Sequence, residues 1–326
     1  MKKVLPGFIH VPGWHCGSTA LADVMRYRGY NLSEAMCFGL GSGLGFVYWQ
    51  GGPTPTHALG GRAPNLELTF FANLGYHLQW ETARADEVWP AIRSALDRGD
   101  PVLALTDLYH LDYYRSHTHF SGHAVVVAGY DDAAIALLAD TDRPGLQEVS
   151  VQSLLRAMQS DFTPFPVHYQ WLAVPPLAPV PLDAPLRQAL TKTARDMLAP
   201  PWPGAGVPGM RSLADDLPGW ASAADWQWSA RFAYQVIERR GTGGGSFRYL
   251  YSRFTAEASH WIPELGHINA PARFWEAGRL WTALAMLFRR ISENSSPGGF
   301  DQAQALVRTL VAAEESLYRD ILSVLK

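Results

Sequence analysis

The chain has 326 residues, of which 48% are hydrophobic and 17% charged, and its formal net charge is −3. This length predicts about two domains, because domains commonly span ~100–200 residues, and the composition excludes an intrinsically disordered protein. The small net charge and the lack of a basic run argue against nucleic-acid binding and electrostatic docking to membranes. No uninterrupted apolar stretch reaches the ~18 residues that a membrane span needs.

The amino-terminal segment MKKVLPGFIHVPG begins with two lysines, as a signal peptide does. Pro6, Gly7 and Pro12 nevertheless break its apolar run well short of a signal sequence. The chain's 2 cysteines form no disulfide framework and fit a reducing compartment. We therefore expect a soluble, cytoplasmic protein with no membrane and no nucleic acid among its partners.

The first half of the chain alternates helical and strand-like segments. STALADVMRYRGY, residues 18–30, has apolar residues at helical spacing, and DEVWPAIRSALDRG repeats the pattern and ends at Gly99. PVLALTDLY predicts a buried strand. HAVVVAGYDDAAIALLAD, residues 123–140, predicts two strands joined by a turn at Asp131 and Asp132.

A proline-rich segment divides the chain. VPPLAPVPLDAP, residues 174–185, contains five prolines, which resist both helix and central strand. Beyond it, apolar stripes of helical period predict helices over residues 226–240, 247–261, 271–293 and 301–325, the last with Asp301 as its N-cap. We therefore predict two domains, residues 1–175 and 176–326, the second a helical bundle in which Trp226, Trp228, Trp275 and Trp281 pack in the core.

Cys16 lies directly before the first predicted helix. A helix N-terminus presents unpaired N–H groups and the positive end of the helix dipole, which favour thiolate over thiol, and a protonated His15 would add to this effect. The alternative is that Cys16 is a small buried residue, since free cysteine is often buried. Cys37 lacks such neighbours and is expected to serve packing.

A thiolate nucleophile needs a base and a group that orients the base. His123 opens the apolar strand HAVVVAGY, at a rim where catalytic groups are commonly found. With a two-residue loop at 131–132, His123 lies opposite Asp140 on one face of the hairpin, whereas Asp142 would need a four-residue loop. Taken singly, each is more often a strand-end histidine or a turn aspartate; together with Cys16 they predict catalysis.

These features resemble the papain-like cysteine protease architecture, and more closely the butirosin-biosynthesis acyltransferase (BtrH-like) family. HCGSTALADVMRYRGYNLSEAMCFGLGSGLGF is similar to the amino-terminal signature of that family, HFSGHAVVVAGYDD and ADTDRPG to its His/Asp segment, and RFAYQVIERRGTGGGSFRYLYSRF to its helical domain. The resemblance spans nearly the whole chain. It implies an α+β fold with a papain-like catalytic domain, residues 1–175, and an all-α helical domain, residues 176–326, that binds substrate or carrier or acts as a lid.

The resemblance implies that Cys16 accepts the acyl group, that His123 is the base and that Asp140 orients it. The implied reaction, in antibiotic biosynthesis, moves an acyl group from an acyl carrier protein or coenzyme A thioester to a small-molecule amine, with no bound cofactor beyond the donor's phosphopantetheine. Papain-like enzymes place an oxyanion-hole glutamine shortly before the cysteine, and here that position holds His10. A neutral His10 would donate one N–H to the oxyanion and the backbone N–H of Cys16 a second.

Two kinds of alternative function remain open, another enzyme that uses Cys16, His123 and Asp140, and a protein that is not an enzyme. A papain-like amidase or peptidase, or a cyclising enzyme, would share the triad, and a non-catalytic scaffold would retain only the fold.

Histidines and an aspartate crowd residues 110–123, but they lack an H-E-x-x-H pattern, and we expect no metal site.

Two glycine-rich segments match no nucleotide-binding pattern. GLGSGLG, residues 39–45, fails the dinucleotide pattern and is interpreted as a flexible wall near Cys16 or as a plain turn. GTGGGS, residues 241–246, has no P-loop lysine and is expected to join two helices, beginning with Gly241 as a C-cap.

Overall fold

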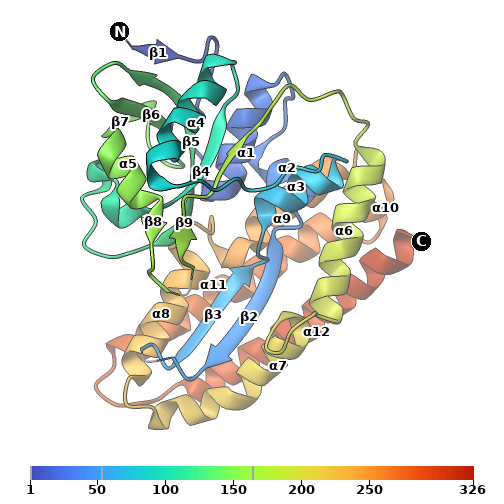
Figure 1. Ribbon diagram of the computed structural model, residues 1–326. Coiled ribbons are helices and arrows are strands. Elements are labelled where there is room, and N and C mark those ends of the chain that lie inside the picture. Colours follow the sequence, from blue (N-terminus) through green and yellow to red (C-terminus); the bar gives the residue numbers. More distant parts are fainter. Residues whose placement is uncertain (1, 53, 164) are drawn as a thin grey trace. The chain divides into compact units, whose positions relative to one another are not determined.

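The computed structural model describes residues 2–52, 54–163 and 165–326 (Figure 1). The chain forms two compact units, and it enters the second unit twice. The first unit comprises Met1–Cys37 and Tyr76–Val180, and the second comprises Phe38–Gly75 and Pro181–Lys326. The later crossing lies in the proline-rich segment, but residues 38–75, which the two-domain prediction assigns to the first domain, pack with the helical unit.

The first unit is built on an antiparallel sheet of order β10-β4-β5-β6-β7, and β1 pairs with β5 beyond the end of β4. The predicted strands are confirmed. The sheet strands are β1 (Lys3–Val4), β4 (Val102–Asp107), β5 (Ser121–Asp131), β6 (Ile135–Ala139), β7 (Leu146–Ser150) and β10 (Trp171–Ala173). A separate pair is formed by β8 (Gln159–Ser160) and β9 (Val167–His168).

Helices cover this sheet, which explains why β5 reads as an almost unbroken apolar run. Val125 and Val127 of β5 share a buried core with Val88 and Ile92 of α4, and α1 also packs against β5. Gly99 adopts φ +87° after α4, so the predicted glycine stop is confirmed. The elements are α1 (Cys16–Tyr27), α4 (Ala85–Asp97), α5 (Val151–Ala157), and the 3₁₀ turns η1 (Leu108–His110) and η2 (Asp112–Tyr114).

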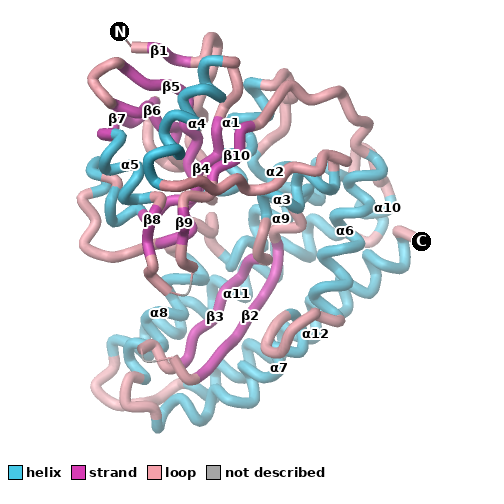
Figure 2. Tube along the Cα trace, in the orientation of Figure 1, coloured by secondary structure: helices cyan, strands magenta, loops and turns pink. Residues whose placement is uncertain are grey.

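The second unit consists mostly of helices, with the β2–β3 hairpin as its strand element, as Figure 2 shows in cyan and magenta. Helix α2 (Glu34–Leu40) spans the first division of the chain. The other elements are β2 (Leu44–Gln50), β3 (His57–Arg62), α3 (Leu66–Asn73), α6 (Asp183–Leu198), α7 (Gly206–Asp216), η3 (Leu217–Ser222), α8 (Trp226–Glu238), η4 (Gly245–Phe247), α9 (Arg248–Ala258), α10 (Glu264–His267), α11 (Ala270–Glu293) and α12 (Phe300–Val324).

Aromatic side chains explain why the hairpin belongs to the helical unit. Phe46 of β2 lies with its ring centroid 5.6 Å from that of Trp281, and Tyr48 stacks on Trp220 at 6.3 Å. The preceding segment GLGSGLG is a buried turn between α2 and β2, which fits the plain-turn interpretation. Burying these rings against α11 and η3 excludes water from a large apolar area and so favours the hairpin's place among the helices.

A fully buried ion pair lies at the centre of the second unit. Nε and Nη2 of Arg248 donate to the two carboxylate oxygens of Glu314 at 3.0 and 2.8 Å. Glu314 also accepts hydrogen bonds from Trp281 Nε1 and the Tyr318 hydroxyl. Because every partner is satisfied, the cluster ties α9, α11 and α12 together without an orphaned charge.

Some details of the helical prediction are wrong. Trp281 is buried in the core, but Trp228 and Trp275 are 39% and 46% exposed, because they lie on the outer faces of their helices. The N-cap of α12 is Gly299, and Asp301 lies within the first turn, where its charge still complements the helix dipole.

The glycine-rich connection joins α8 and α9 as expected, but Gly241 is not the C-cap. That position belongs to Arg239, and Gly241 follows it with φ +67°. In the same connection, Gly245 approaches Gly278 so closely that a Cβ atom would lie 2.8 Å from the Gly278 Cα. This contact requires glycine at position 245, whereas a Cβ atom at Gly278 would instead lie 2.7 Å from the ring of Tyr249.

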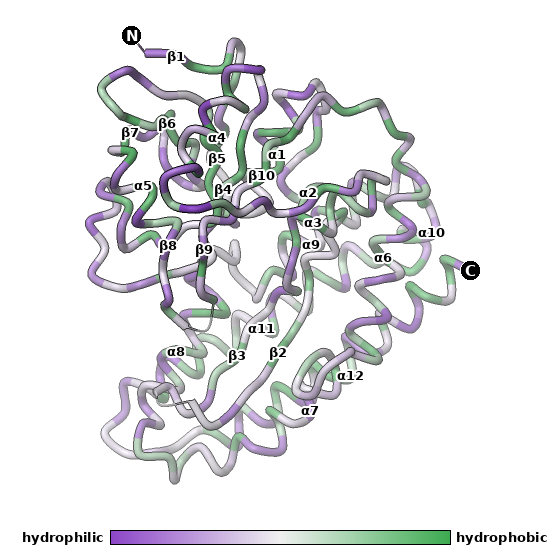
Figure 3. The backbone as a smooth tube through the Cα atoms, viewed as in Figure 1, coloured by the Kyte–Doolittle hydropathy of each residue, from purple (hydrophilic) through white to green (hydrophobic). Residues whose placement is uncertain are grey.

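Among the described helices, none combines the length and apolar character needed to cross a bilayer. Figure 3 shows green and purple stretches alternating along the helices of the second unit. Such alternation is typical of helices with one buried and one solvated face.

Candidate active site

Cys16 is the first residue of α1, which begins two residues earlier than the apolar pattern alone predicts. His15 is the N-cap residue, and its Nδ1 accepts a hydrogen bond from the backbone N–H of Ser18 at 3.2 Å. An imidazole that accepts at Nδ1 carries no proton there and is neutral. The condition for a contribution from His15, a protonated ring, is therefore not met in this arrangement, and the helix N-terminus itself favours the Cys16 thiolate.

Glu34 fixes the loop that precedes the cysteine. Its carboxylate accepts the backbone N–H groups of Trp14 and His15, the latter at 2.8 Å, and the hydroxyls of Ser18 and Thr19 at 3.2 Å. These bonds join the start of α2 to both sides of Cys16. The sequence gives no sign of this role, because nothing local points from position 34 back to the loop.

His123 lies on β5, opposite Thr106 of β4, beside a bulge in the β4–β5 pairing. Its ring is buried, and its Nε2 lies 2.7 Å from Oδ1 of Asp140. The side chain also makes a hydrogen bond with Cys16. Since Nε2 is bonded to Asp140, Nδ1 is the nitrogen that faces the thiol.

The charges around His123 favour its protonated form. Burial alone would lower the pKa of the imidazole, but the carboxylate of Asp140 and the contact with Cys16 outweigh it and raise the pKa to about 10. The pKa of Asp140 is lowered, because hydrogen bonds from His123 and Tyr113 outweigh the cost of burying the carboxylate. An imidazolium beside Cys16 is the arrangement that stabilises a thiolate.

Two tyrosines complete the shell of Asp140. The hydroxyl of Tyr113 donates to Oδ2 at 2.5 Å, and that of Tyr114 donates to Oδ1 at 3.2 Å. Burial and the adjacent carboxylate raise the pKa of both hydroxyls, so both remain protonated donors. Their direct contact with Asp140 depends on how the loop between β4 and β5 folds back.

The hairpin brings His123 and Asp140 together by a different register from the expected one. The loop is one residue longer, since Asp131 pairs with Ile135, and Tyr130 pairs with Ala136 rather than Ala133. A bulge near Gly129 then shifts the pairing again, so that Asp140 is not directly opposite His123. The net displacement is two residues, and because strand side chains alternate with period two, Asp140 stays on the same face, diagonal to His123.

His10 does not fit the expected oxyanion-hole role. Its Nδ1 lies 2.5 Å from Oδ2 of Asp23, and its Nε2 lies 3.0 Å from the carbonyl oxygen of Arg143. Both nitrogens are therefore already used within the protein, and neither is available to a substrate oxyanion. The position of His10 before Cys16 predicts the oxyanion role but gives no sign of Asp23, which lies on α1 seven residues after Cys16 and on the same face of the helix.

A second group of titratable side chains lies near the start of the β4–β5 connection. Asp107, His110 and His119 place one potential ligand atom each within 4.8 Å of one another. Each oxygen of Asp107 already accepts two hydrogen bonds, from Tyr109 and Phe120 backbone N–H groups and from the His119 ring and Ser160 hydroxyl. A metal would have to displace one of these donors, and the absence of a metal stays a prediction.

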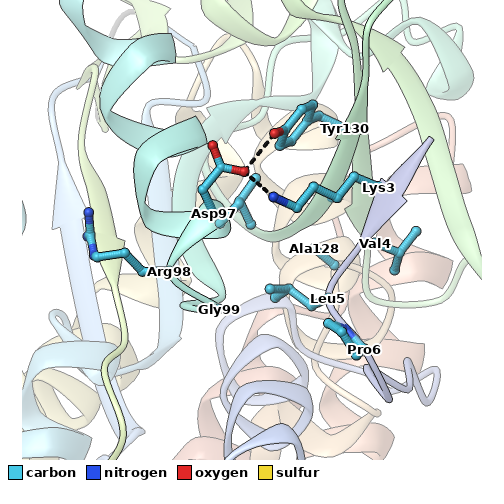
Figure 4. A pocket seen from close by; sticks show the side chains of 11 residues that line it. Lys3, Val4, Leu5, Pro6, Asp97, Arg98, Gly99, Ala128 and Tyr130 are labelled. Carbon is cyan, nitrogen blue, oxygen red and sulfur yellow. Dashed lines mark hydrogen bonds and ion pairs between the residues drawn. The ribbon is translucent and has the colours of Figure 1, made fainter. Parts of the chain in front are cut away.

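A pocket elsewhere in the first unit holds no candidate nucleophile. It has a volume of about 270 Å³ and lies where β1 meets the far end of β5 (Figure 4). Asp97 there accepts hydrogen bonds from Lys3 and Tyr130. Tyr130 is separated from His123 by seven residues of strand, or roughly 23 Å, so we place the chemistry at Cys16 and not in this pocket.

Two family models match the chain. Residues 15–141, which contain Cys16, His123 and Asp140, match the amino-terminal model of butirosin biosynthesis protein H, and residues 152–321 match a domain of unknown function, DUF4872. The chain belongs to the butirosin biosynthesis protein H-like family. No curated protein matches it. The family takes its name from butirosin biosynthesis, which gives this chain the context of an enzyme of small-molecule biosynthesis.

Proposed function

We propose that this family member is a cysteine-dependent acyltransferase that moves an acyl group from a thioester to an amine through an acyl-Cys16 intermediate. The observation that carries the proposal is the continuous contact from Cys16 to His123 and on to the buried Asp140. A nucleophile, a base within hydrogen-bond reach and a group that orients the base are the parts that such catalysis needs.

In the acylation step, the Cys16 thiolate attacks the carbonyl carbon of the donor thioester. The tetrahedral intermediate collapses by breaking the bond between that carbon and the donor sulfur, and the imidazolium of His123 gives its proton to the departing thiolate. One thioester replaces another, so the step has little thermodynamic cost. It leaves acyl-Cys16 and a neutral His123.

In the transfer step, the neutral imidazole takes a proton from the incoming amine as its nitrogen attacks acyl-Cys16. Collapse expels the Cys16 thiolate and forms the amide, which restores the thiolate–imidazolium pair. Asp140 keeps the ring oriented in both steps and stabilises its charged form, as the acid of a triad does.

The negative oxygen of each tetrahedral intermediate needs a donor. We assign this role to the backbone N–H of Cys16 at the positive end of α1. The N–H groups of Trp14 and His15 point to Glu34 and do not serve it. His10 is excluded, since its two nitrogens are engaged.

The family context supports a choice of donor and acceptor. We propose a donor thioester on phosphopantetheine, attached to a carrier protein or coenzyme A, and an acceptor amine on a small-molecule intermediate, with no other cofactor. A role for the helical unit in binding substrate or carrier, or as a lid, is part of this proposal.

An amine chase tests the proposal and separates transfer from hydrolysis. The protein is first loaded with acyl-pantetheine thioesters, and then a panel of primary amines is added while the acyl-enzyme and the products are followed by mass spectrometry. A transferase loses its adduct only when amine is present and yields amide in equal amount. Loss of the adduct to water at the same rate without amine would instead support the amidase or peptidase interpretation.

A further inference from the structure

His10 and Asp23 form a buried pair next to the candidate triad. The two side chains are 2% and 1% exposed, and Nδ1 of His10 lies 2.5 Å from Oδ2 of Asp23. The other carboxylate oxygen accepts the backbone N–H of Val11 and a hydrogen bond from Arg26. A buried charged pair of this kind needs every hydrogen bond satisfied, and here each oxygen has a donor.

The second nitrogen of His10 reaches the turn that carries Asp140. Nε2 lies 3.0 Å from the carbonyl oxygen of Arg143, whose own N–H donates to the carbonyl oxygen of Asp140 at 2.8 Å. A carboxylate and a carbonyl both accept, so the ring is bonded at both ends only when each nitrogen carries a proton. The pKa of His10 is raised, because the bonds to Asp23 and the Arg143 carbonyl outweigh the effect of burial.

The same turn is strained and needs support. Thr141 adopts φ +24°, a conformation that costs a non-glycine residue about 1–3 kcal/mol. Its carbonyl oxygen accepts a hydrogen bond from the N–H of Gly13, at 2.8 Å, in the loop between His10 and Cys16. The amino-terminal loop therefore holds the turn at two points.

We propose that His10 is a positioning residue that links helix α1 to the 140–143 turn and so sets the place of Asp140 relative to Cys16. Asp23 lies seven residues after Cys16, or about two helical turns, and therefore on the same face of α1. Helix α1 thus carries the nucleophile Cys16 at its start. Two turns later it carries Asp23, which through His10 fixes the turn that holds Asp140. This inference rests on the proposed function, in which Asp140 orients His123.

The reactivity of Cys16 towards iodoacetamide tests the inference without a substrate. The rate constant for alkylation is measured at pH 7 on the peptide that contains Cys16, for the wild type, His10→Gln, Asp140→Asn and the double variant. Glutamine has its donors on one atom and cannot bond acceptors at opposite ends, so His10→Gln is expected to slow alkylation about tenfold through loss of thiolate. In the Asp140→Asn background the same substitution is expected to change the rate less than twofold, because residues acting through one path are not additive.

Three further variants keep the test decisive. Asp23→Ala removes the partner of His10 and is expected to match His10→Gln. Asp23→Asn can donate from its amide to a neutral His10 whose Nε2–H still bonds Arg143, so its rate is expected within about threefold of the wild type. His119→Gln disrupts another His–Asp pair, in which a partly exposed His119 ring lies 2.6 Å from the buried Asp107. That pair lies outside the 140–143 turn, and the rate is expected to stay unchanged.

The results distinguish the positioning role of His10 from the catalytic role of the triad. An unchanged rate in His10→Gln, or an equal loss with and without Asp140, overturns the positioning role. If His10→Gln and Asp23→Ala do not fold, the test passes to Asp23→Asn. A decrease in its alkylation rate as large as that of Asp140→Asn overturns the positioning role as well. If Asp140→Asn alkylates at the wild-type rate, Asp140 does not act on Cys16 through His123. The triad itself, and with it the proposed function, would then be wrong.

Discussion

Replacing Tyr113 by phenylalanine removes one hydrogen bond from a fully buried carboxylate. Tyr113 is the partner of Asp140 Oδ2 at 2.5 Å, whereas Tyr114 shares Oδ1 with His123 at the longer distance of 3.2 Å. Hydrogen bonds to charged groups stabilise folded proteins by about 1.5–3 kcal/mol. We expect Tyr113→Phe to lower the unfolding free energy of the first unit by about 2 kcal/mol and Tyr114→Phe by about 1 kcal/mol or less.

Hydrogen exchange of the β5 and β6 amides in increasing urea measures this difference where it arises, since the two units need not unfold in one step. The pKa of Asp140 is lowered in the folded protein, so its contribution is present above the ordinary carboxyl value of 3.8 and is lost as the pH falls through the folded value. The gap between the two variants should therefore be full at pH 7 and close in acid. Equal effects of the two substitutions, or none from Tyr113→Phe, would refute this account of the Asp140 shell.

Three other predictions follow from single contacts. Glu34→Gln loses an acceptor for one loop N–H and should slow iodoacetamide alkylation of Cys16 about three- to tenfold; an unchanged rate argues against a positioning role for Glu34. His123 has a pKa raised from 6.5 to about 10, so its stabilising effect is complete below pH 6.5 and is lost as the pH rises towards 10; the fall in unfolding free energy over this range should be smaller in His123→Gln, and an identical slope contradicts the assignment. Arg248→Met leaves Glu314 charged and unpaired in the core and should destabilise the second unit by about 3–5 kcal/mol in urea unfolding, whereas a loss below 1 kcal/mol would mean that the pair is dispensable.

Local periodicity was enough to predict the longest helices and the central strands of the fold. Helices α1 and α4 with its Gly99 stop, the long strand β5, and helices α8, α9, α11 and α12 follow from patterns that span a single element, whereas α6 and α7 were not predicted. Residues 38–75 could not be assigned in this way, because what places their hairpin is the packing of Phe46 and Tyr48 against helices far along the chain. No pattern within the hairpin reports that contact.

The candidate site shows the same limit. Cys16, His123 and Asp140 were accessible to sequence reasoning because a helix start and a hairpin bring chemistry to predictable places. The expected pairing of the two strands was displaced by two residues from the observed one. Asp140 still lies on the same face as His123, because strand side chains alternate with a period of two. Partners such as Tyr113 and Asp23 depend on loops that fold back over long sequence separations, and their positions in the chain give no sign of it.

The intact mass of the protein after incubation with acyl-pantetheine thioesters, with no amine present, tests the central claim most directly. The account predicts a persistent adduct of one acyl group on the wild type, mapped to the peptide containing Cys16, and none on Cys16→Ala. Cys37 is fully buried and serves as the internal control, since it should stay unmodified in both proteins. An adduct that survives in Cys16→Ala, or thioesters left untouched by the wild type, would contradict the assignment of Cys16 as the acyl-accepting nucleophile.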